Sequence, residues 1–189
     1  MIFKVGNKEY IGQCNALSYI FHKRLFKISI FNEIDNLKAL LISITQGKNI
    51  EDDSMLFYES IKRVIYTFLY TNSKEINLFE NWEKQIKNKD ITENIINEVI
   101  EILLTSFIDE EVNEKLEKLL DKGKESKEIF PEHSYLKICL KFGLSIECLK
   151  ELTYIDTMKV FISSIDEEKS EKTSYVKKAT QQDIDRFLG

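Results

Sequence analysis

The chain contains 189 residues and carries a formal charge of −5 at pH 7, with 43% hydrophobic and 11% aromatic residues. This apolar content excludes a disordered chain and provides a core that needs no metal or disulfide to hold it together. The acidic balance argues against nucleic acid as a partner, because binding to phosphates requires a basic surface.

Membrane insertion and secretion are also disfavoured. The most apolar stretch, residues 95–108, includes Glu98 and Glu101 and is too short to cross a bilayer. The opening MIFKVGNKEY lacks the apolar region of a signal peptide. We therefore expect a cytoplasmic protein whose thiols are small buried hydrophobic groups; they belong to Cys14, Cys139 and Cys148.

The first elements are predicted from turn and capping signals. Residues 2–5 and 9–11 flank Gly6-Asn7, a pair suited to the tight turn of a β-hairpin. Asn15 is expected to cap a helix with Leu17, Ile20, Phe21 and Leu25 on one face. The alternating segment 27–31 fits either a short strand or the end of a helix.

Apolar residues at helical spacing continue from residue 32 to residue 120. Helices are predicted from residue 32 to a stop at Gly47, over 52–70, and over 78–86. Asp90 and Glu93 suggest a capping box for the next helix, and a further helix is expected over 112–120. The apolar faces of these helices contain Ile34, Leu37, Leu40 and Leu41; Phe57, Ile61, Val64, Ile65 and Phe68; Ile96, Ile100, Leu103 and Phe107; and Val112, Leu116, Leu119 and Leu120.

A change of composition divides the chain. Residues 121–128 are charged or small and are followed by Phe130-Pro131, which marks a linker. Beyond it, Gly143 is expected to end one helix, Ser145 to cap a short one, and Thr153 with Asp156 to open another. Residues 166–178 lack helical periodicity and are predicted to be mobile.

The predicted fold class is therefore mainly α, a helical bundle with a small N-terminal β-hairpin. We divide the chain into a helical domain (1–122), a linker (123–131), a small helical extension (132–165) and a flexible tail with a terminal amphipathic turn (166–189).

No pattern of catalytic, cofactor-binding or metal-binding residues is evident. The glycines fit no phosphate-binding loop, and His22 and His133 have no partner at metal-ligand spacing. Both histidines are interpreted as ordinary helix or loop residues. Glu98 and Glu101 are interpreted as a solvated helix edge, and the sequence predicts neither an enzyme nor a cofactor.

Two features favour binding instead. Tyr58, Tyr66 and Tyr70 share one face of the helix over 52–70, with Lys62 between them, and tyrosine is enriched at interfaces. The alternative is a helix with core contacts on two sides. Ile184, Phe187 and Leu188 form a terminal amphipathic turn that fits a groove of a partner or of the chain's own domain. Tyr154 and Phe161 of the extension complete the candidate partner-binding residues.

Several segments resemble the tail assembly chaperones of bacteriophages and prophages of Gram-positive bacteria. The opening IFKVGNKEY is similar to the hairpin start of these proteins. Residues 142–147 (FGLSIE) with 152–156 (LTYID) are similar to a segment of the family, and ATQQDIDRFLG is similar to the ending of phage tail gene products. The resemblance covers the C-terminal third, whereas residues 30–120 match no motif.

The resemblance implies a non-enzymatic chaperone that binds the tape measure protein and recruits tail tube subunits. It also implies that the N-terminal domain holds the tape measure protein, while the extension contacts tube protein. A programmed frameshift near residues 121–128 belongs to the same scheme. A structural tail or baseplate component and a cytoplasmic helical adaptor are the alternatives, and formation of a homo-oligomer stays open.

Overall fold

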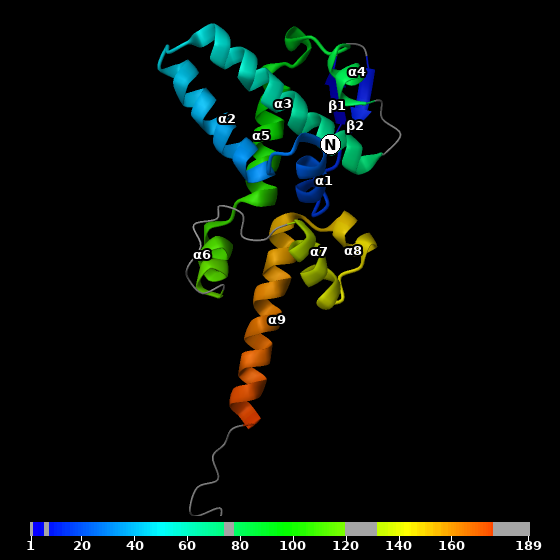
Figure 1. Cartoon of the computed structure of the whole chain (residues 1–189), viewed down its shortest axis with the longest axis vertical. Coiled ribbons are helices and arrows are strands. Elements are labelled where there is room, and N and C mark those ends of the chain that lie inside the picture. Colours follow the sequence, from blue (N-terminus) through cyan, green and yellow to red (C-terminus); the bar gives the residue numbers. More distant parts are fainter. Residues whose placement is uncertain (1, 6–7, 74–77, 120–131, 176–189) are drawn as a thin grey trace, which may run out of the picture.

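The computed structural model describes residues 2–5, 8–73, 78–119 and 132–175. The described chain is mainly helical, as predicted, with one β-hairpin at its start (Figure 1). Its elements are β1 (Ile2–Val5), β2 (Lys8–Ile11), α1 (Ser18–Phe26), α2 (Ile30–Thr45), α3 (Ile50–Asn72), α4 (Phe79–Glu83), the 3₁₀ turn η1 (Asn88–Asp90), α5 (Glu93–Phe107), α6 (Glu110–Leu119), α7 (Glu132–Lys141), α8 (Ile146–Glu151) and α9 (Tyr154–Tyr175).

The N-terminal hairpin has one face toward the core and one toward solvent. Its antiparallel register pairs Ile2 with Ile11 and Phe3 with Tyr10. Side chains alternate between the two faces of a strand, so Tyr10 packs edge-on against Trp82 at 6.4 Å while Ile2 and Ile11 stay exposed. The predicted turn at Gly6-Asn7 lies outside the described residues.

The segment 27–31 is not a strand: it contains the end of α1 and the start of α2. Lys27 adopts a left-handed conformation (φ 61°) that ends α1. Ser29 then caps α2, since its Oγ accepts a hydrogen bond from the backbone N–H of Asn32 at 3.2 Å. The expected cap at Asn15 is wrong: Leu17 is the N-cap of α1, and the Asn15 side chain instead bonds to the backbone N–H of Leu17 and the carbonyl of Lys150.

Helix α3 is the central element, and its core positions were predicted correctly. It runs from Ile50 to Asn72 and contacts both α1 and α2. Gly47, with φ 72°, lies in the turn between α2 and α3, where a left-handed conformation favours glycine. Leu41 was predicted to share the buried face of α2 but is exposed.

Helix α5 begins two residues later than the sequence suggested. Thr92, not Asp90, is its N-cap, while the Asp90 carboxylate accepts from the backbone N–H of Lys87 within η1. The most buried face carries Ile95, Val99, Leu103 and Phe107 at four-residue spacing, whereas Ile96 and Ile100 are half-buried. Two i,i+4 ion pairs lie on α6, Glu111–Lys115 at 2.6 Å and Glu114–Lys118 at 3.5 Å.

The capping signals after the linker are confirmed. Gly143 ends α7 at φ 77°, and Ser145 Oγ accepts from the backbone N–H of Cys148 at 3.2 Å. Thr153 and Asp156 form a reciprocal capping box at the start of α9, with N–O distances of 3.0 and 3.1 Å. The predicted mobile segment is partly wrong, because α9 continues to Tyr175. Glu and Lys are good helix formers, so residues 166–175 need no apolar stripe to extend a nucleated helix.

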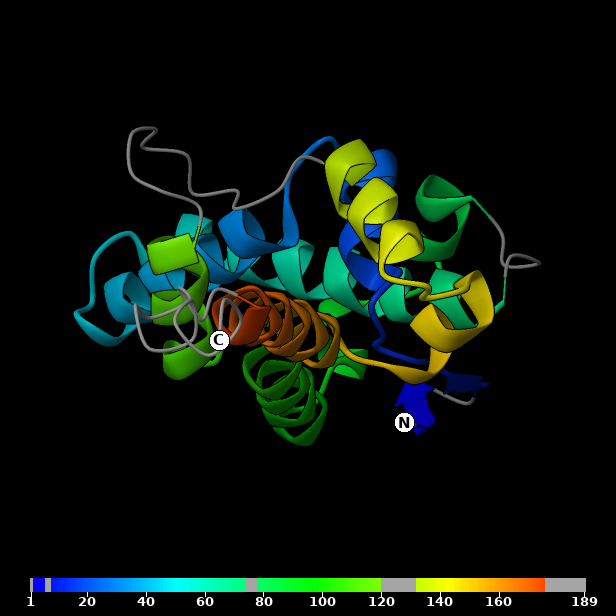
Figure 2. The same ribbon diagram turned by 90° about the horizontal axis from the view of Figure 1, so that it is seen from below.

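The helices beyond the linker share one core with the N-terminal helices. The Tyr154 ring lies 5.4 Å from Tyr19, 5.2 Å from Phe31 and 5.8 Å from Phe107, and it stacks on Tyr135 at 5.6 Å. Figure 2, seen from below, shows α9 end-on with α5 beside it. By its packing the extension is therefore no separate appendage, although the linker 123–131 itself lies outside the described residues.

Candidate functional site

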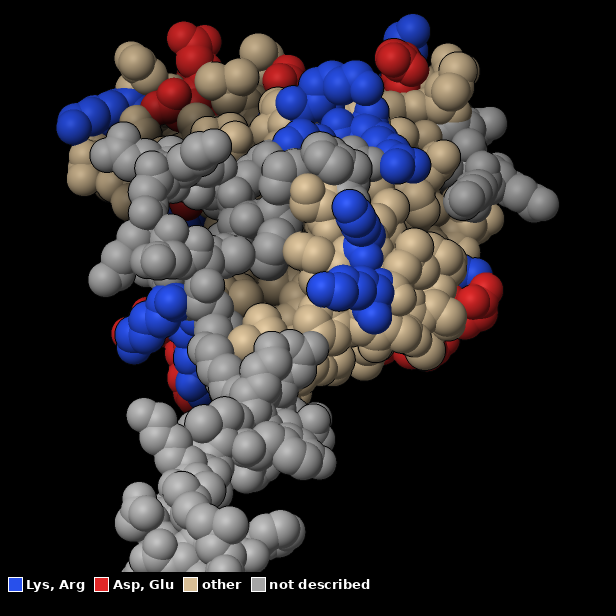
Figure 3. All heavy atoms as spheres, turned by 60° about the horizontal axis from the view of Figure 1, so that its bottom comes forward, with Lys and Arg blue, Asp and Glu red and all other residues tan. Residues whose placement is uncertain are grey.

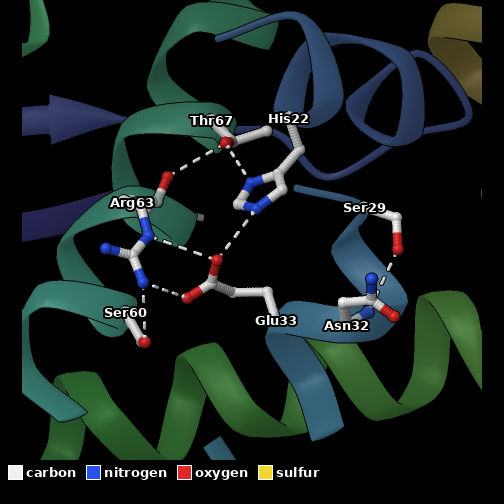
Figure 4. Close-up of polar contacts among 7 residues, drawn as sticks. All are labelled: His22, Ser29, Asn32, Glu33, Ser60, Arg63 and Thr67. Atoms are coloured by element: carbon white, nitrogen blue, oxygen red, sulfur yellow. Dashed lines mark hydrogen bonds and ion pairs between the residues drawn. The ribbon is translucent and has the colours of Figure 1, made fainter. Parts of the chain in front are cut away.

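A cluster of polar side chains is buried where α1, α2 and α3 meet (Figure 4). His22 comes from α1, Glu33 from α2, and Arg63 and Thr67 from α3. His22, Glu33 and Thr67 are fully buried, while the Arg63 side chain is 22% exposed. His22 is thus more than the ordinary helix residue that the sequence suggested. Because buried ionisable clusters are often functional, this one is the first candidate for a site.

Glu33 and Arg63 form a forked ion pair. One carboxylate oxygen accepts from Arg63 Nη2 at 2.7 Å and the other accepts from Arg63 Nε at 3.2 Å. Burial alone would raise the pKa of Glu33, but hydrogen bonds from His22 and Arg63 outweigh it and hold the pKa at about 2. Glu33 is therefore a carboxylate at neutral pH, and Arg63 balances its charge.

His22 links this ion pair to α3. Its Nε2 lies 3.3 Å from Glu33 Oε2, and its Nδ1 lies 2.8 Å from Thr67 Oγ1. Burial lowers the pKa of His22, so the imidazole is neutral at pH 7. Since the Glu33 carboxylate can only accept, the proton of the neutral ring belongs on Nε2. The single hydroxyl hydrogen of Thr67 is shared between His22 Nδ1 and the Arg63 carbonyl of the preceding turn, which lies 2.9 Å from Thr67 Oγ1.

A carboxylate, an imidazole and a hydroxyl in this order have the connectivity of a hydrolase triad. The nucleophile of a triad must reach a substrate carbonyl, however, and Thr67 is completely buried. In this structure the hydrogen bonds of the cluster therefore connect α1, α2 and α3. The sequence did contain a signal for this cluster. Glu33 lies on the same face of α2 as the buried Ile30, Ile34 and Leu37, and a carboxylate on a buried face needs a cation as its partner.

The predicted tyrosine face of α3 is largely covered. Tyr66 is buried among Phe26, Phe79 and Trp82, with ring separations of 5.2–6.2 Å. Tyr70 stacks on Tyr66 at 6.3 Å and is half-buried, as is Tyr58. Tyr66 therefore corresponds to the alternative of a helix with core contacts on two sides, because the short α4 folds over it. In this conformation it offers no surface to a partner.

The other predicted site residues lie elsewhere. Tyr154 is at the centre of the shared aromatic core, and Phe161 is buried against Phe142 at 5.2 Å. Neither side chain is available to a partner in this conformation. Ile184, Phe187 and Leu188 lie outside the described residues. The candidates are thus not brought together into one surface by the described structure.

The end of the α2–α3 pair carries exposed apolar side chains that the sequence analysis did not single out. We call this end the α2–α3 tip; its large side chains that are 45–55% exposed belong to Leu41, Ile42, Ile50, Met55 and Leu56. Ser43 Oγ donates to Asp53 Oδ2 at 2.5 Å and joins the two helices there. In Figure 1 this end projects from the upper left of the molecule. Large apolar groups gathered on a surface are typical of binding sites.

The thiols differ in exposure, which corrects the prediction that all three are buried. Cys139 is buried and Cys14 half-buried, but Cys148 is exposed. Burial raises the pKa of both Cys14 and Cys139 to about 11, so these two are unreactive thiols at neutral pH.

Within the described parts of the chain, no three His, Cys, Asp or Glu side chains gather closely enough to ligate a metal ion. None of the helices described there combines the length and the apolar character needed to span a bilayer.

Comparison with known proteins adds no assignment. No protein-family model, curated protein or solved structure matches the chain significantly. The functional argument therefore depends on the surfaces of this chain and on the resemblance of its C-terminal third.

Proposed function

We propose that this chain is a non-enzymatic chaperone of phage tail assembly that binds the tape measure protein and recruits tail tube subunits. The observation that carries the proposal is the α2–α3 tip, an apolar surface on the N-terminal part of a mainly helical chain with an acidic balance. A chaperone needs apolar surface for its client and net charge to stay in solution without it.

The tip is suited to an amphipathic helix with basic residues beside its apolar face. Its apolar side chains come from the ends of two antiparallel helices, a geometry into which a third helix packs. Glu51 and Asp52, in the first turn of α3, are exposed beside Ile50 and supply acidic charge at its margin. A long helical tape measure protein offers many such segments, which is the client that the resemblance implies.

The extension is assigned to the tube subunits in this proposal. Its long helix α9 projects away from the body of the molecule in Figure 1. The two proposed binding regions therefore lie at opposite ends of the molecule. Such an arrangement allows both partners to be held at once.

The test is a pull-down from the lysogenic host after prophage induction. The tagged full chain is compared with the double variant Ile42→Ser/Met55→Ser, which removes apolar area from the tip. We expect the unaltered chain to retain the tape measure protein, identified by mass spectrometry. With the double variant the amount of tape measure protein recovered should fall at least about 10-fold, since two exposed side chains contribute roughly 1–3 kcal/mol to an interface.

The matched control is Ile11→Ser, which alters an equally exposed isoleucine on β2. It should retain the client, and thermal melts should show that all variants are folded. Equal recovery by the double variant and the control would remove the tip from the proposal. Retention of a metabolic or regulatory complex in place of tail proteins would instead favour the helical adaptor, and presence of the chain in purified particles would favour a structural tail component.

A further inference from the structure

Further exposed apolar side chains lie around the junction of α7 and α8, which we call the α7–α8 strip. Leu140 and Ile146 are 56% and 40% exposed. Leu136 precedes Leu140 by one helical turn and is half-buried, as is Leu144. The backbone N–H of Leu144 donates to the carbonyl of Cys139 at 3.0 Å, which holds Leu144 against the end of α7.

The strip is bordered by basic side chains on α7. Lys137 and Lys141 are both exposed, one residue after Leu136 and Leu140 respectively. Figure 3 shows groups of Lys and Arg side chains near the middle of the lower face, while side chains of both signs lie toward its edges. On α8 the exposed charges are mixed, with Glu147, Lys150 and Glu151. The α7 side of the strip therefore favours an acidic ligand with an apolar face.

The chain carries such a ligand at its own C-terminus. Ile184, Phe187 and Leu188 are spaced three and four residues apart, so in one helical turn they share a face. Asp183 and Asp185 flank Ile184 and outnumber the one cation of the segment, Arg186, so the segment supplies the complementary charge.

The length of the chain beyond α9 permits the contact. The Phe142–Phe161 ring contact at 5.2 Å places the end of α7 beside Phe161 of α9. From Phe161 to the end of α9 at Tyr175 the helix rises by about 21 Å. From Tyr175 to Ile184 an extended chain spans up to about 30 Å, which is enough to return to the strip. The α2–α3 tip is excluded, because it lies at the opposite end of the molecule from the end of α9 (Figure 1).

We propose that residues 180–188 dock on the α7–α8 strip of the same molecule, with Ile184, Phe187 and Leu188 against Leu140 and Ile146. The docked segment covers apolar surface that is otherwise open to solvent, and a partner that binds the strip must displace it. The terminal segment is thus an intramolecular competitor for the binding surface of the extension. This inference concerns the chain alone and does not depend on the identity of the client.

The test is disulfide trapping in the full chain. Glu147→Cys and Gly189→Cys place one thiol beside the strip and one beside the segment, in a Cys148→Ser background that removes the exposed native thiol. Oxidised glutathione should close an intramolecular disulfide at least about 10-fold faster than in the same protein carrying Phe187→Asp. Leu140→Asp should slow closure equally, since it alters the other side of the same contact.

Both aspartate variants keep the length of the connecting chain, so a change in rate reports docking and not reach. Thermal melts show whether the strip variants are folded. If Leu140→Asp is unfolded, Phe187→Asp still tests the contact, because it leaves the strip unchanged. Equal rates in all proteins would overturn the proposal. Disulfide-linked dimers at low micromolar concentration would overturn it as well, because the strip would then bind the segment of a second copy.

Discussion

At the scale of single residues, the described chain buries an ionisable cluster of which only the Arg63 side chain is partly exposed. Taking the Glu33–Arg63 pair and a histidine out of water costs free energy that only close hydrogen bonding offsets. The bonds of Glu33, Arg63, His22 and Thr67 run between α1, α2 and α3, so they fix how these helices sit against one another.

The cluster makes stability dependent on pH. Because the pKa of His22 is lowered in the folded chain, the unfolded chain takes up a proton first as the pH falls below about 6.5. The free energy of unfolding should therefore fall between pH 7 and 5, by up to about 1.4 kcal/mol per pH unit. The pKa of Glu33, about 2 against 4.5 when unfolded, adds a second loss of about 3 kcal/mol between pH 4.5 and 2.

Urea denaturation at a series of pH values measures this dependence, with His22→Gln as the matched variant. Glutamine keeps a donor for Glu33 but does not titrate, so the loss of stability between pH 7 and 5 should shrink in the variant. Stability that rises as the pH falls through this range would show instead that His22 is protonated in the fold and paired with Glu33 as a cation.

At the scale of elements, local signals specified the helix ends where a side chain bonds to the nearby backbone. Ser145, and Thr153 with Asp156, cap α8 and α9 as their spacing indicates. Asn15 and Asp90 are also typical capping residues, but their side chains bond to other backbone groups. Asn15 donates to the carbonyl of Lys150, and Asp90 accepts from the N–H of Lys87 at the η1 turn. A capping residue is therefore a preference of the sequence that packing can redirect.

The capping box of α9 gives a prediction for one element. Thr153→Ala removes the hydroxyl that accepts from the backbone N–H of Asp156, and should lower the free energy of unfolding by about 1 kcal/mol. The matched control is Thr105→Ala on α5, where the exposed hydroxyl bonds back to Glu101 and a loss near zero is expected. Urea melts of both variants measure the difference, and equal losses would contradict the assigned role of the cap.

At the scale of the whole molecule, the aromatic core joins segments that the sequence separates. Tyr154 of α9 packs between Tyr19, Phe31, Phe107 and Tyr135, which come from both sides of the linker. Removing the extension would expose these aromatic rings to water. A function divided between an N-terminal domain and an extension must therefore operate through one packed body.

Because the parts before and after the linker share one core, we expect them to associate also when they are expressed as two separate chains. Residues 1–125 and 126–189, expressed together as separate chains, should co-elute as one complex on size-exclusion chromatography. Tyr154→Ala should weaken their association by about 100-fold or more, since deleting a buried aromatic side chain costs roughly 3–5 kcal/mol. Titration of one labelled half with the other measures this change. Halves that elute separately would establish two independent domains.

The sequence by itself determined the helical class, the β-hairpin, the core positions of α3, the C-terminal end of α7 and the starts of α8 and α9. These depend on spacing and on bonds between residues a few positions apart, which a sequence displays directly. The tertiary structure alone decided that α4 covers Tyr66, that Tyr154 joins the two parts of the chain, that His22 meets Glu33, and that Leu41 and Ile42 face solvent. Each of these depends on which surfaces meet across long sequence separations, and apolar residues at helical spacing show which face of a helix is apolar but not what covers it.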